Sequence, residues 1–391
     1  MRRLFLFMGV FLLCFLCVKV VQAEEPGETD GLGEEELKEM QRQTENNILK
    51  EFDFSEVDEN LRKLFPEQKI QFSDVLGAMT DGDLEEAGTL FGSYLRDQFD
   101  YEFRANRKNL IYMLLIAVIA AVFTNFSSAF QNKQVSEISF YVLYMLLITM
   151  CLTSFRIAME GLEGRLEQLL ELMQVLCPGY FLAVTIASGS SSSFAFYNLV
   201  LFFIYLVEVL VLKFLLPLIN VYIMIQVMNY LAGEDLLSEL ADLIRKGVLW
   251  ILKMLLGCVI GLNVIQGMLS PAIDTLKRST ITKTVEAIPA LGNMFGSVTD
   301  VVLGTAVLIK NGIGMAGAIL LLLASMIPVV QMMVLALFYK LAAALVQPVS
   351  DKRITGCIRS VSEGYALMLR VLSTTVILFL ITIAVIAAST S

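Results

Sequence analysis

Long uncharged apolar runs fill the chain after residue 109, and they constrain its fold more than any other feature. Each run is near or above the length of about 20 residues that a helix needs to cross a bilayer. The longer runs must hold two passes or a broken one. The chain is therefore predicted to be an all-α, polytopic helical membrane protein. The runs cover residues 110–132, 138–155, 172–207, 214–233, 254–273, 311–339 and 371–391.

The composition supports a membrane protein and argues against an enzyme. The chain is 57% hydrophobic, with a mean hydropathy of +0.71, whereas soluble chains are about 45–50% apolar. It contains no histidine, which excludes histidine bases, histidine-activated nucleophiles and histidine-ligated zinc. The four cysteines beyond residue 23 are spread singly, as small packing residues are. We therefore predict no catalytic residue, no metal and no cofactor.

The first 23 residues have the features of a secretory signal peptide. Arg2 and Arg3 precede an apolar stretch, and Val21-Gln22-Ala23 provides small residues for cleavage after Ala23. An uncleaved anchor helix is the alternative. If the signal is cleaved, the residues that follow it lie outside the cytoplasm.

Residues 24–109 form a small acidic segment, predicted to be extracytoplasmic. They carry 23 acidic and 10 basic side chains, whereas residues 110–391 carry 15 and 16. Residues 24–36 are acidic and glycine-rich and are predicted to be flexible. Apolar residues then return at helical spacing, which predicts a small helical region that runs into the first membrane helix. The acidity argues against a nucleic-acid partner.

Three polar interruptions are predicted to break the apolar runs. Pro178-Gly179 breaks one run, and Lys310-Asn311-Gly312 interrupts another. The join between two further spans is marked by Glu208, Lys213 and Pro217. With these breaks, about eight or nine transmembrane helices follow the signal, within a membrane domain of residues 110–391. Lysine and arginine occur on both sides of the membrane under every alternating scheme, so the orientation stays open.

Residues 156–174 have a different, amphipathic pattern. An acidic stripe of Glu163, Glu167 and Glu171 runs along one face of the predicted helix. The stripe is either a solvated face or a docking face for a basic partner. Apolar residues repeat at three-and-four spacing, which predicts a buried face. These residues are Leu162, Leu166, Leu169, Met173 and Leu176.

Two parts of the membrane domain, residues 194–269 and 301–388, indicate an internal repeat. The sequence around Pro217 resembles that around Pro328, and Ile244-Arg245 aligns with Ile358-Arg359. Each part reads as span, proline, span, polar link and span. Such repeats are typical of transporter folds.

Charged residues inside membrane spans are costly and therefore mark candidate sites. Lys213, Lys253, Lys340 and Arg370 lie near run ends, where long side chains reach the interface. Lys310 lies deeper in its run, and glycines follow it. The candidate site, a broken-helix conduit or a packing site, comprises Lys310, Asn311, Gly312, Gly314 and Gly317. Glu208 and Lys253 are further candidate intramembrane polar residues.

The same glycines formally match the dinucleotide-binding pattern of three spaced glycines. That pattern requires a preceding strand and an acidic residue about 20 residues later. Residues 334–339 are entirely uncharged, so we reject a cofactor site and interpret the glycines as close helix packing or a hinge.

Two segments, residues 308–317 and 335–351, resemble the stage III sporulation protein AE family of endospore-forming bacteria. The first holds Lys310-Asn311-Gly312, and the second holds Gln347-Pro348-Val349-Ser350-Asp351. The resemblance also covers the layout of nearly the whole chain, including Gly296 and Asp300 at the end of a polar interval.

The resemblance implies a multi-pass protein in the mother-cell membrane that surrounds the forespore. It implies a non-enzymatic subunit of the assembly that links mother cell and forespore during engulfment. The implied partners are other stage III sporulation A-operon proteins, namely a secretion-type ATPase and ring-forming and small membrane subunits, together with a forespore-side channel protein and the lipid bilayer. The alternative is a secondary transporter, or permease, for an unknown small solute.

Overall fold

The computed structural model describes a set of long helices and one short one. It describes residues 54–64, 71–73, 75–76, 84–127, 133–188, 192–232, 237–285, 292–348 and 350–388. The predicted signal peptide, its cleavage site after Ala23 and the predicted flexible residues 24–36 lie outside these residues.

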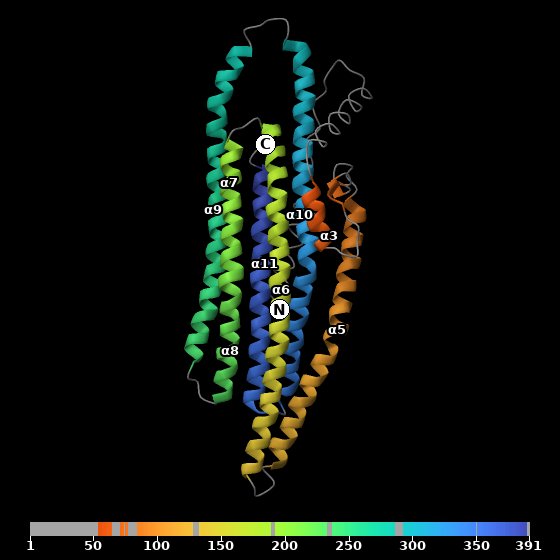
Figure 1. Ribbon diagram of the computed structural model, residues 1–391, viewed down its shortest axis with the longest axis vertical. Helices are drawn as coiled ribbons and strands as arrows, with labels where there is room; N and C mark the ends of the chain where they lie inside the picture. Colours follow the sequence, from red (N-terminus) through yellow and green to blue (C-terminus); the bar gives the residue numbers. More distant parts are fainter. Residues whose placement is uncertain are drawn as a thin grey trace.

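All regular structure in the described residues is helical, which confirms the all-α prediction. The helices are α3 (Ser55–Leu64), α5 (Leu84–Ser127), α6 (Lys133–Ser188), α7 (Ser192–Glu208), α8 (Leu216–Ala232), α9 (Ser238–Val285), α10 (Gly292–Val346) and α11 (Lys352–Ala388). A π-helical segment, η2 (Val209–Leu215), joins α7 to α8. The long helices run side by side in an elongated bundle (Figure 1).

Four described segments are long and apolar enough to cross a membrane, which supports an integral membrane protein. They are Tyr141–Ala187, Tyr197–Tyr230, Gly304–Val346 and Lys352–Ala384. The predicted count of eight or nine spans is not confirmed. The 56 residues of α6 correspond to about 84 Å of helix, whereas a bilayer core is about 30 Å thick. A helix of this length extends beyond the hydrocarbon core.

The predicted helix breaks at Pro178 and at Lys310 are wrong. α6 continues through Pro178, and α10 continues through Lys310, its glycines and Pro328. A proline inside a helix costs about 3 kcal/mol. In an apolar surrounding, however, an opened backbone would leave several unsatisfied polar groups, each costing several kcal/mol. The continuous helix is therefore the less costly state.

A π-helical segment also replaces the predicted join at Lys213 and Pro217. The N–H of Leu216 donates to the carbonyl of Val211, five residues back. This wider turn accommodates Pro217, which has no N–H to donate. Residues 192–232 thus form one rod in which the helical path shifts but does not turn back.

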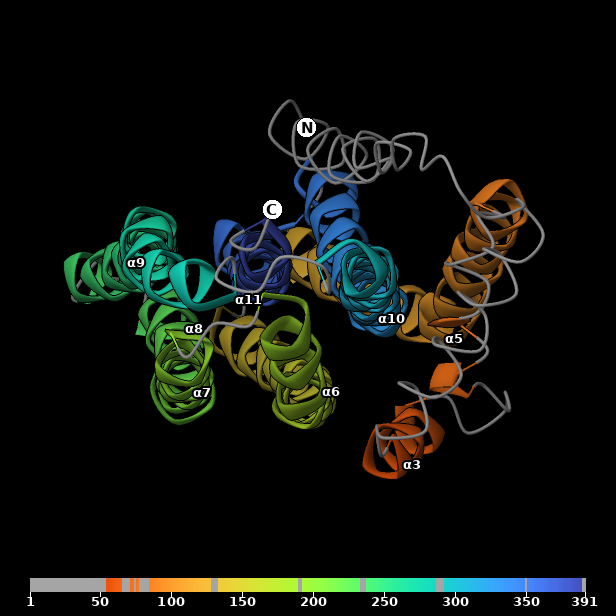
Figure 2. The same ribbon diagram turned by 90° about the horizontal axis from the view of Figure 1, so that it is seen from above.

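The centre of the bundle is formed by α6, α10 and α11. α11 lies between α10 on one side and α8 and α9 on the other, and α5 covers the outer side of α10 (Figure 2). Fully buried side chains from the three central helices include Leu166, Ile313 and Leu372. α7 contacts α6, and α9 packs against α8 and α11.

The amphipathic part of α6 packs into the bundle on one side and contacts the short helix α3 on another. The apolar residues predicted for its buried face are all buried: Leu162, Leu166, Leu169, Met173 and Leu176. On the acidic stripe, Glu171 lies 3.3 Å from the Lys63 ammonium of α3. Glu163 is half-buried and Glu167 is exposed. Part of the stripe is therefore a docking face for a basic residue of this chain's own N-terminal segment.

The two predicted repeat units share a helical layout. α8 ends at Ala232 and α9 begins at Ser238, while α10 ends at Val346 and α11 begins at Lys352. Arg245 and Arg359 therefore follow the starts of α9 and α11 at the same interval. The internal duplication stays a prediction.

Candidate functional site

The predicted glycines of α10 lie at its crossing with α6. A Cβ atom on Gly314 would lie 2.7 Å from the hydroxyl oxygen of Tyr180, and one on Gly317 would overlap the side chain of Leu176. The Tyr180 hydroxyl also donates to the carbonyl oxygen of Ile383 on α11, at 3.2 Å. Since α10 is continuous here, these glycines permit close packing of three helices, not a hinge.

Lys310 lies at the same junction and is almost completely buried, with 1% of its surface exposed. It precedes Gly314 by four residues and so shares its helix face, one turn away. Asn311 is half-buried and Gly312 is buried. By contrast, the four residues predicted to reach the interface are all exposed: Lys213, Lys253, Lys340 and Arg370. Lys310 therefore differs from these four residues in being buried, as its position deep within an apolar run predicted.

Two helices end beyond the junction that contains Lys310. α6 ends at Ser188 and α11 ends at Ala388, a short way beyond Tyr180 and Ile383. The C-terminal end of a helix carries partial negative charge from its free carbonyl groups. This charge acts within the last turn of a helix, whereas Tyr180 and Ile383 lie eight and five residues before the two ends, so the burial of Lys310 stays costly.

The two remaining predicted polar residues lie away from this junction. Glu208 ends α7 and accepts a hydrogen bond from the Gln174 amide of α6, at 3.2 Å. Gln174 is exposed, so this contact lies on the outside of the bundle. Lys253 is exposed on α9. The structure therefore groups Lys310 with Gly314 and Gly317, and it does not bring Glu208 or Lys253 to them.

A second polar cluster, centred on Glu363 of α11, was not predicted from the sequence. Its carboxylate accepts a hydrogen bond from the Tyr222 hydroxyl of α8 at 3.1 Å. It also lies 3.7 Å from Arg245 of α9 and 3.7 Å from Arg359 of its own helix. The cluster joins three helices and carries one net positive charge. The alignment of Arg245 with Arg359 was the available signal, because both arginines reach the same carboxylate.

Glu102 is the other charged residue that is buried among the described side chains. It is 6% exposed on α5, near the ring contact of Phe103 with Phe338 of α10. Burial raises the pKa of the Glu102 carboxyl, and a hydrogen bond from the Asn106 amide, at 3.0 Å, partly opposes this rise. Glu102 precedes the first apolar run, so it titrates outside the membrane-spanning segments.

The raised pKa of Glu102 predicts a pH-dependent stability. A buried carboxyl whose folded-state pKa exceeds its unfolded-state value of about 4.3 stabilises the fold less as pH rises. The loss begins at the unfolded pKa and is complete above the folded one. We expect Glu102→Gln to raise the melting temperature at pH 7, with a benefit that shrinks as pH falls toward 4. Glu167→Gln, at an exposed position, is the control. The same dependence of melting temperature on pH in Glu102→Gln and in the unaltered chain would contradict this prediction.

No group of three or more His, Cys, Asp or Glu side chains could hold a metal ion within the described residues. The site is instead a buried lysine beside a close crossing of three apolar helices. Together with the four long apolar segments, this arrangement defines a helical integral membrane protein.

Comparison with known proteins then identifies the family. The chain belongs to the stage III sporulation protein AE family, whose model matches residues 70–390. It is 27% identical over 298 residues to stage III sporulation protein AE of Bacillus subtilis (strain 168), which covers 75% of this chain and 74% of the relative. No solved structure matches the chain. The resemblance to this family that residues 308–317 and 335–351 indicated is thereby confirmed.

Proposed function

We propose that this chain is a non-enzymatic integral membrane subunit of the transport or secretion complex between mother cell and forespore. The observation that carries the proposal is the family match over residues 70–390, because sporulation is the process that the family's description names. The four apolar segments support a place in a membrane. The proposed membrane is that of the mother cell where it surrounds the forespore.

The proposed partners are the other stage III sporulation A-operon proteins and the forespore-side channel protein. The length of the helices supports a role within a larger assembly. α6 and α10, with 56 and 55 residues, extend well beyond a bilayer core of about 30 Å. Their outer parts provide surface beyond the hydrocarbon core for an ATPase, ring-forming subunits or other small membrane subunits.

Removal of the chain from its host tests the proposed process. We expect cells that lack it to grow normally and to form few heat-resistant spores, with sporulation restored by a copy expressed only after sporulation begins. Spore counts before and after heating measure this effect. A growth defect in vegetative cells together with normal sporulation would contradict the proposal.

A secondary transporter is a second candidate, and one observation favours it. α9 and α11, which hold the aligned pairs Ile244-Arg245 and Ile358-Arg359, each direct an arginine to Glu363. Transporter sites lie where such repeats meet. A transporter moves solute when the purified chain alone is reconstituted in vesicles, whereas a complex subunit is inert alone. Uptake of radiolabelled amino acids and nucleotides by such vesicles distinguishes the two candidates.

A further inference from the structure

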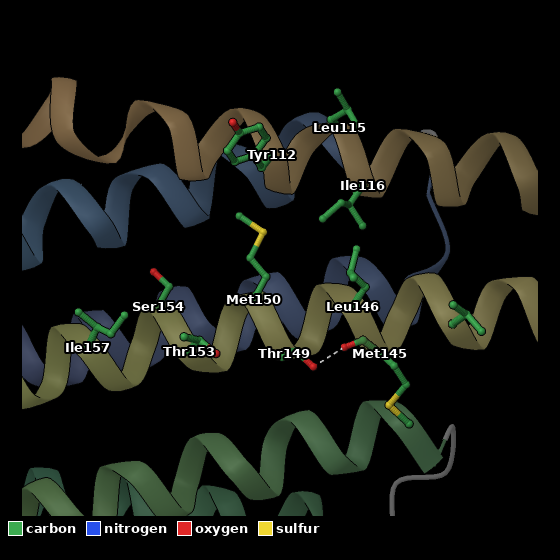
Figure 3. Close-up of a pocket in the computed structure, with 11 residues that line it drawn as sticks. Tyr112, Leu115, Ile116, Met145, Leu146, Thr149, Met150, Thr153, Ser154 and Ile157 are labelled. Atoms are coloured by element: carbon green, nitrogen blue, oxygen red, sulfur yellow. Dashed lines mark hydrogen bonds between the residues drawn. The ribbon is translucent and has the colours of Figure 1, made fainter.

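An open apolar groove of about 800 Å³ lies between α5 and α6. Ligand pockets in proteins are typically about 300–1,000 Å³. Figure 3 shows Ile116 of α5 and Leu146 and Met150 of α6 directed into the space between the two helices. Tyr112, Leu115 and Ile157 complete much of its wall. Tyr112 and Leu115 are more than half exposed, at 57% and 52%, so the groove is accessible from outside the bundle.

One end of this groove is bordered by exposed basic side chains of α5. Lys108 lies one turn before Tyr112, and Arg104 lies one turn before Lys108, so both share the groove's face. Arg107 stands in the same relation to Ile111 and Leu115. These three residues, Arg104, Arg107 and Lys108, are exposed, and we name them the basic rim.

The charge of the basic rim is not neutralised within the part of the chain that the structure describes. The ion pairs among the described residues involve other side chains, such as Arg156 with Glu160 of α6 at 2.8 Å. Glu102 of α5 is buried on the side away from solvent. Asp100 is exposed but lies a further turn from the groove than Arg104. The rim is therefore a local excess of positive charge on a segment that is acidic as a whole.

We propose that this groove binds an anionic phospholipid, with an acyl chain along the apolar wall and the phosphate at the basic rim. The two halves of the site match the two halves of such a lipid. Basic residues at the end of an apolar surface between membrane helices recognise lipid phosphate through charge. A zwitterionic lipid would cover the apolar wall equally well, but its headgroup would be attracted much less strongly to the positive charges of the basic rim.

The chain's single tryptophan makes a direct test feasible. Trp250 is 63% exposed on α9, whereas the groove lies between α5 and α6, so the unaltered chain reports on general lipid contact. A second reporter, Tyr112→Trp with Trp250→Phe, places the tryptophan in the groove. Each full-length chain is reconstituted in vesicles of equal phosphatidylcholine and phosphatidylglycerol, with bromine on the acyl chains of only one lipid. Bromine quenches tryptophan on contact, so the two quenching curves give a relative binding constant.

At the groove reporter we expect phosphatidylglycerol to be preferred by roughly five-fold or more, the order expected from one basic side chain near a lipid phosphate. At Trp250 the ratio should be lower than at the groove reporter, because Lys246, one turn before Trp250, is paired with Asp242 at 2.6 Å and Lys253 is a single exposed lysine beside it. Replacing the rim by glutamine (Arg104→Gln, Arg107→Gln and Lys108→Gln) should return the groove ratio to near one. The matched control replaces three exposed lysines elsewhere (Lys213→Gln, Lys253→Gln and Lys340→Gln) and should keep the preference.

Three outcomes would overturn the proposal. Equal quenching by both lipids at the groove reporter would mean that the groove is ordinary lipid-facing surface. Quenching of Trp250 but not of the groove reporter, by either lipid, would mean that protein covers the groove. If the lysine control variant also loses the preference for phosphatidylglycerol, that preference comes from the overall charge of the protein and not from the basic rim.

Discussion

We expect Lys310→Ala to lower the yield of heat-resistant spores by more than an order of magnitude, whereas Lys340→Ala leaves it nearly unchanged. Both lysines belong to α10, but Lys310 is 1% exposed and Lys340 is exposed. A buried ionisable residue in a membrane helix is costly to keep, so its presence indicates a function. An exposed lysine at a run end serves mainly to anchor the side chain at the interface.

Lys310→Met separates the charge of Lys310 from its packing. Methionine fills a similar volume without a charge, so it avoids the cavity that alanine leaves. We expect Lys310→Met to sporulate as poorly as Lys310→Ala, while the purified protein melts at the same or a higher temperature. Normal sporulation of Lys310→Met would mean that the lysine acts only by filling space. Equal defects in Lys310→Ala and Lys340→Ala would also contradict a special role.

The second large effect is expected at the close crossing of α6 and α10. Gly314→Ala should destabilise the protein by about 1–3 kcal/mol, the usual cost of inserting a methyl group into a filled core. The added Cβ would lie 2.7 Å from the Tyr180 hydroxyl oxygen, and that hydroxyl is held by its hydrogen bond to Ile383. The melting temperature of the detergent-solubilised protein measures the loss.

Gly304→Ala is the matched control, because it lies on the same helix with no atom within 4 Å of the added Cβ. A glycine-to-alanine change at such a position favours the helix by about 0.5–1 kcal/mol, so the melting temperature should stay the same or rise. Tyr180→Phe removes the oxygen nearest to the new methyl group. Combined with Gly314→Ala, it should therefore cost less than the two single changes together. Strict additivity would show that the predicted overlap does not occur.

The class of protein could be predicted from hydropathy, because long uncharged runs leave a chain few alternatives in lipid. The number of helices could not. Pro178 and Gly312 were interpreted by their local propensities, but tertiary packing and the cost of an open backbone in an apolar surrounding override those propensities. The amphipathic face of residues 156–174 was predicted correctly, because the spacing of the apolar residues and the polarity of the residues between them both indicate a helix with one buried face.

The candidate site was predictable only in part. Lys310 was distinguished by its depth within an apolar run, and its burial agrees with that position. The contacts of Tyr180 with Gly314 and with Ile383 were not predictable, because these residues come from three helices far apart in sequence. The cluster at Glu363 was not predictable for the same reason, because its partners Tyr222 and Arg245 lie on other helices.

Co-purification from sporulating cells distinguishes a subunit of a complex from a protein that acts alone. An affinity-tagged copy of the full chain, expressed from its own locus, is solubilised in mild detergent after engulfment begins, and the bound proteins are identified by mass spectrometry. A tagged membrane protein of vegetative growth is the control. For a subunit of the complex we expect stage III sporulation A-operon proteins to be recovered with this chain and not with the control. Recovery of the chain alone, together with solute uptake by vesicles that contain only this chain, would contradict the proposed subunit role.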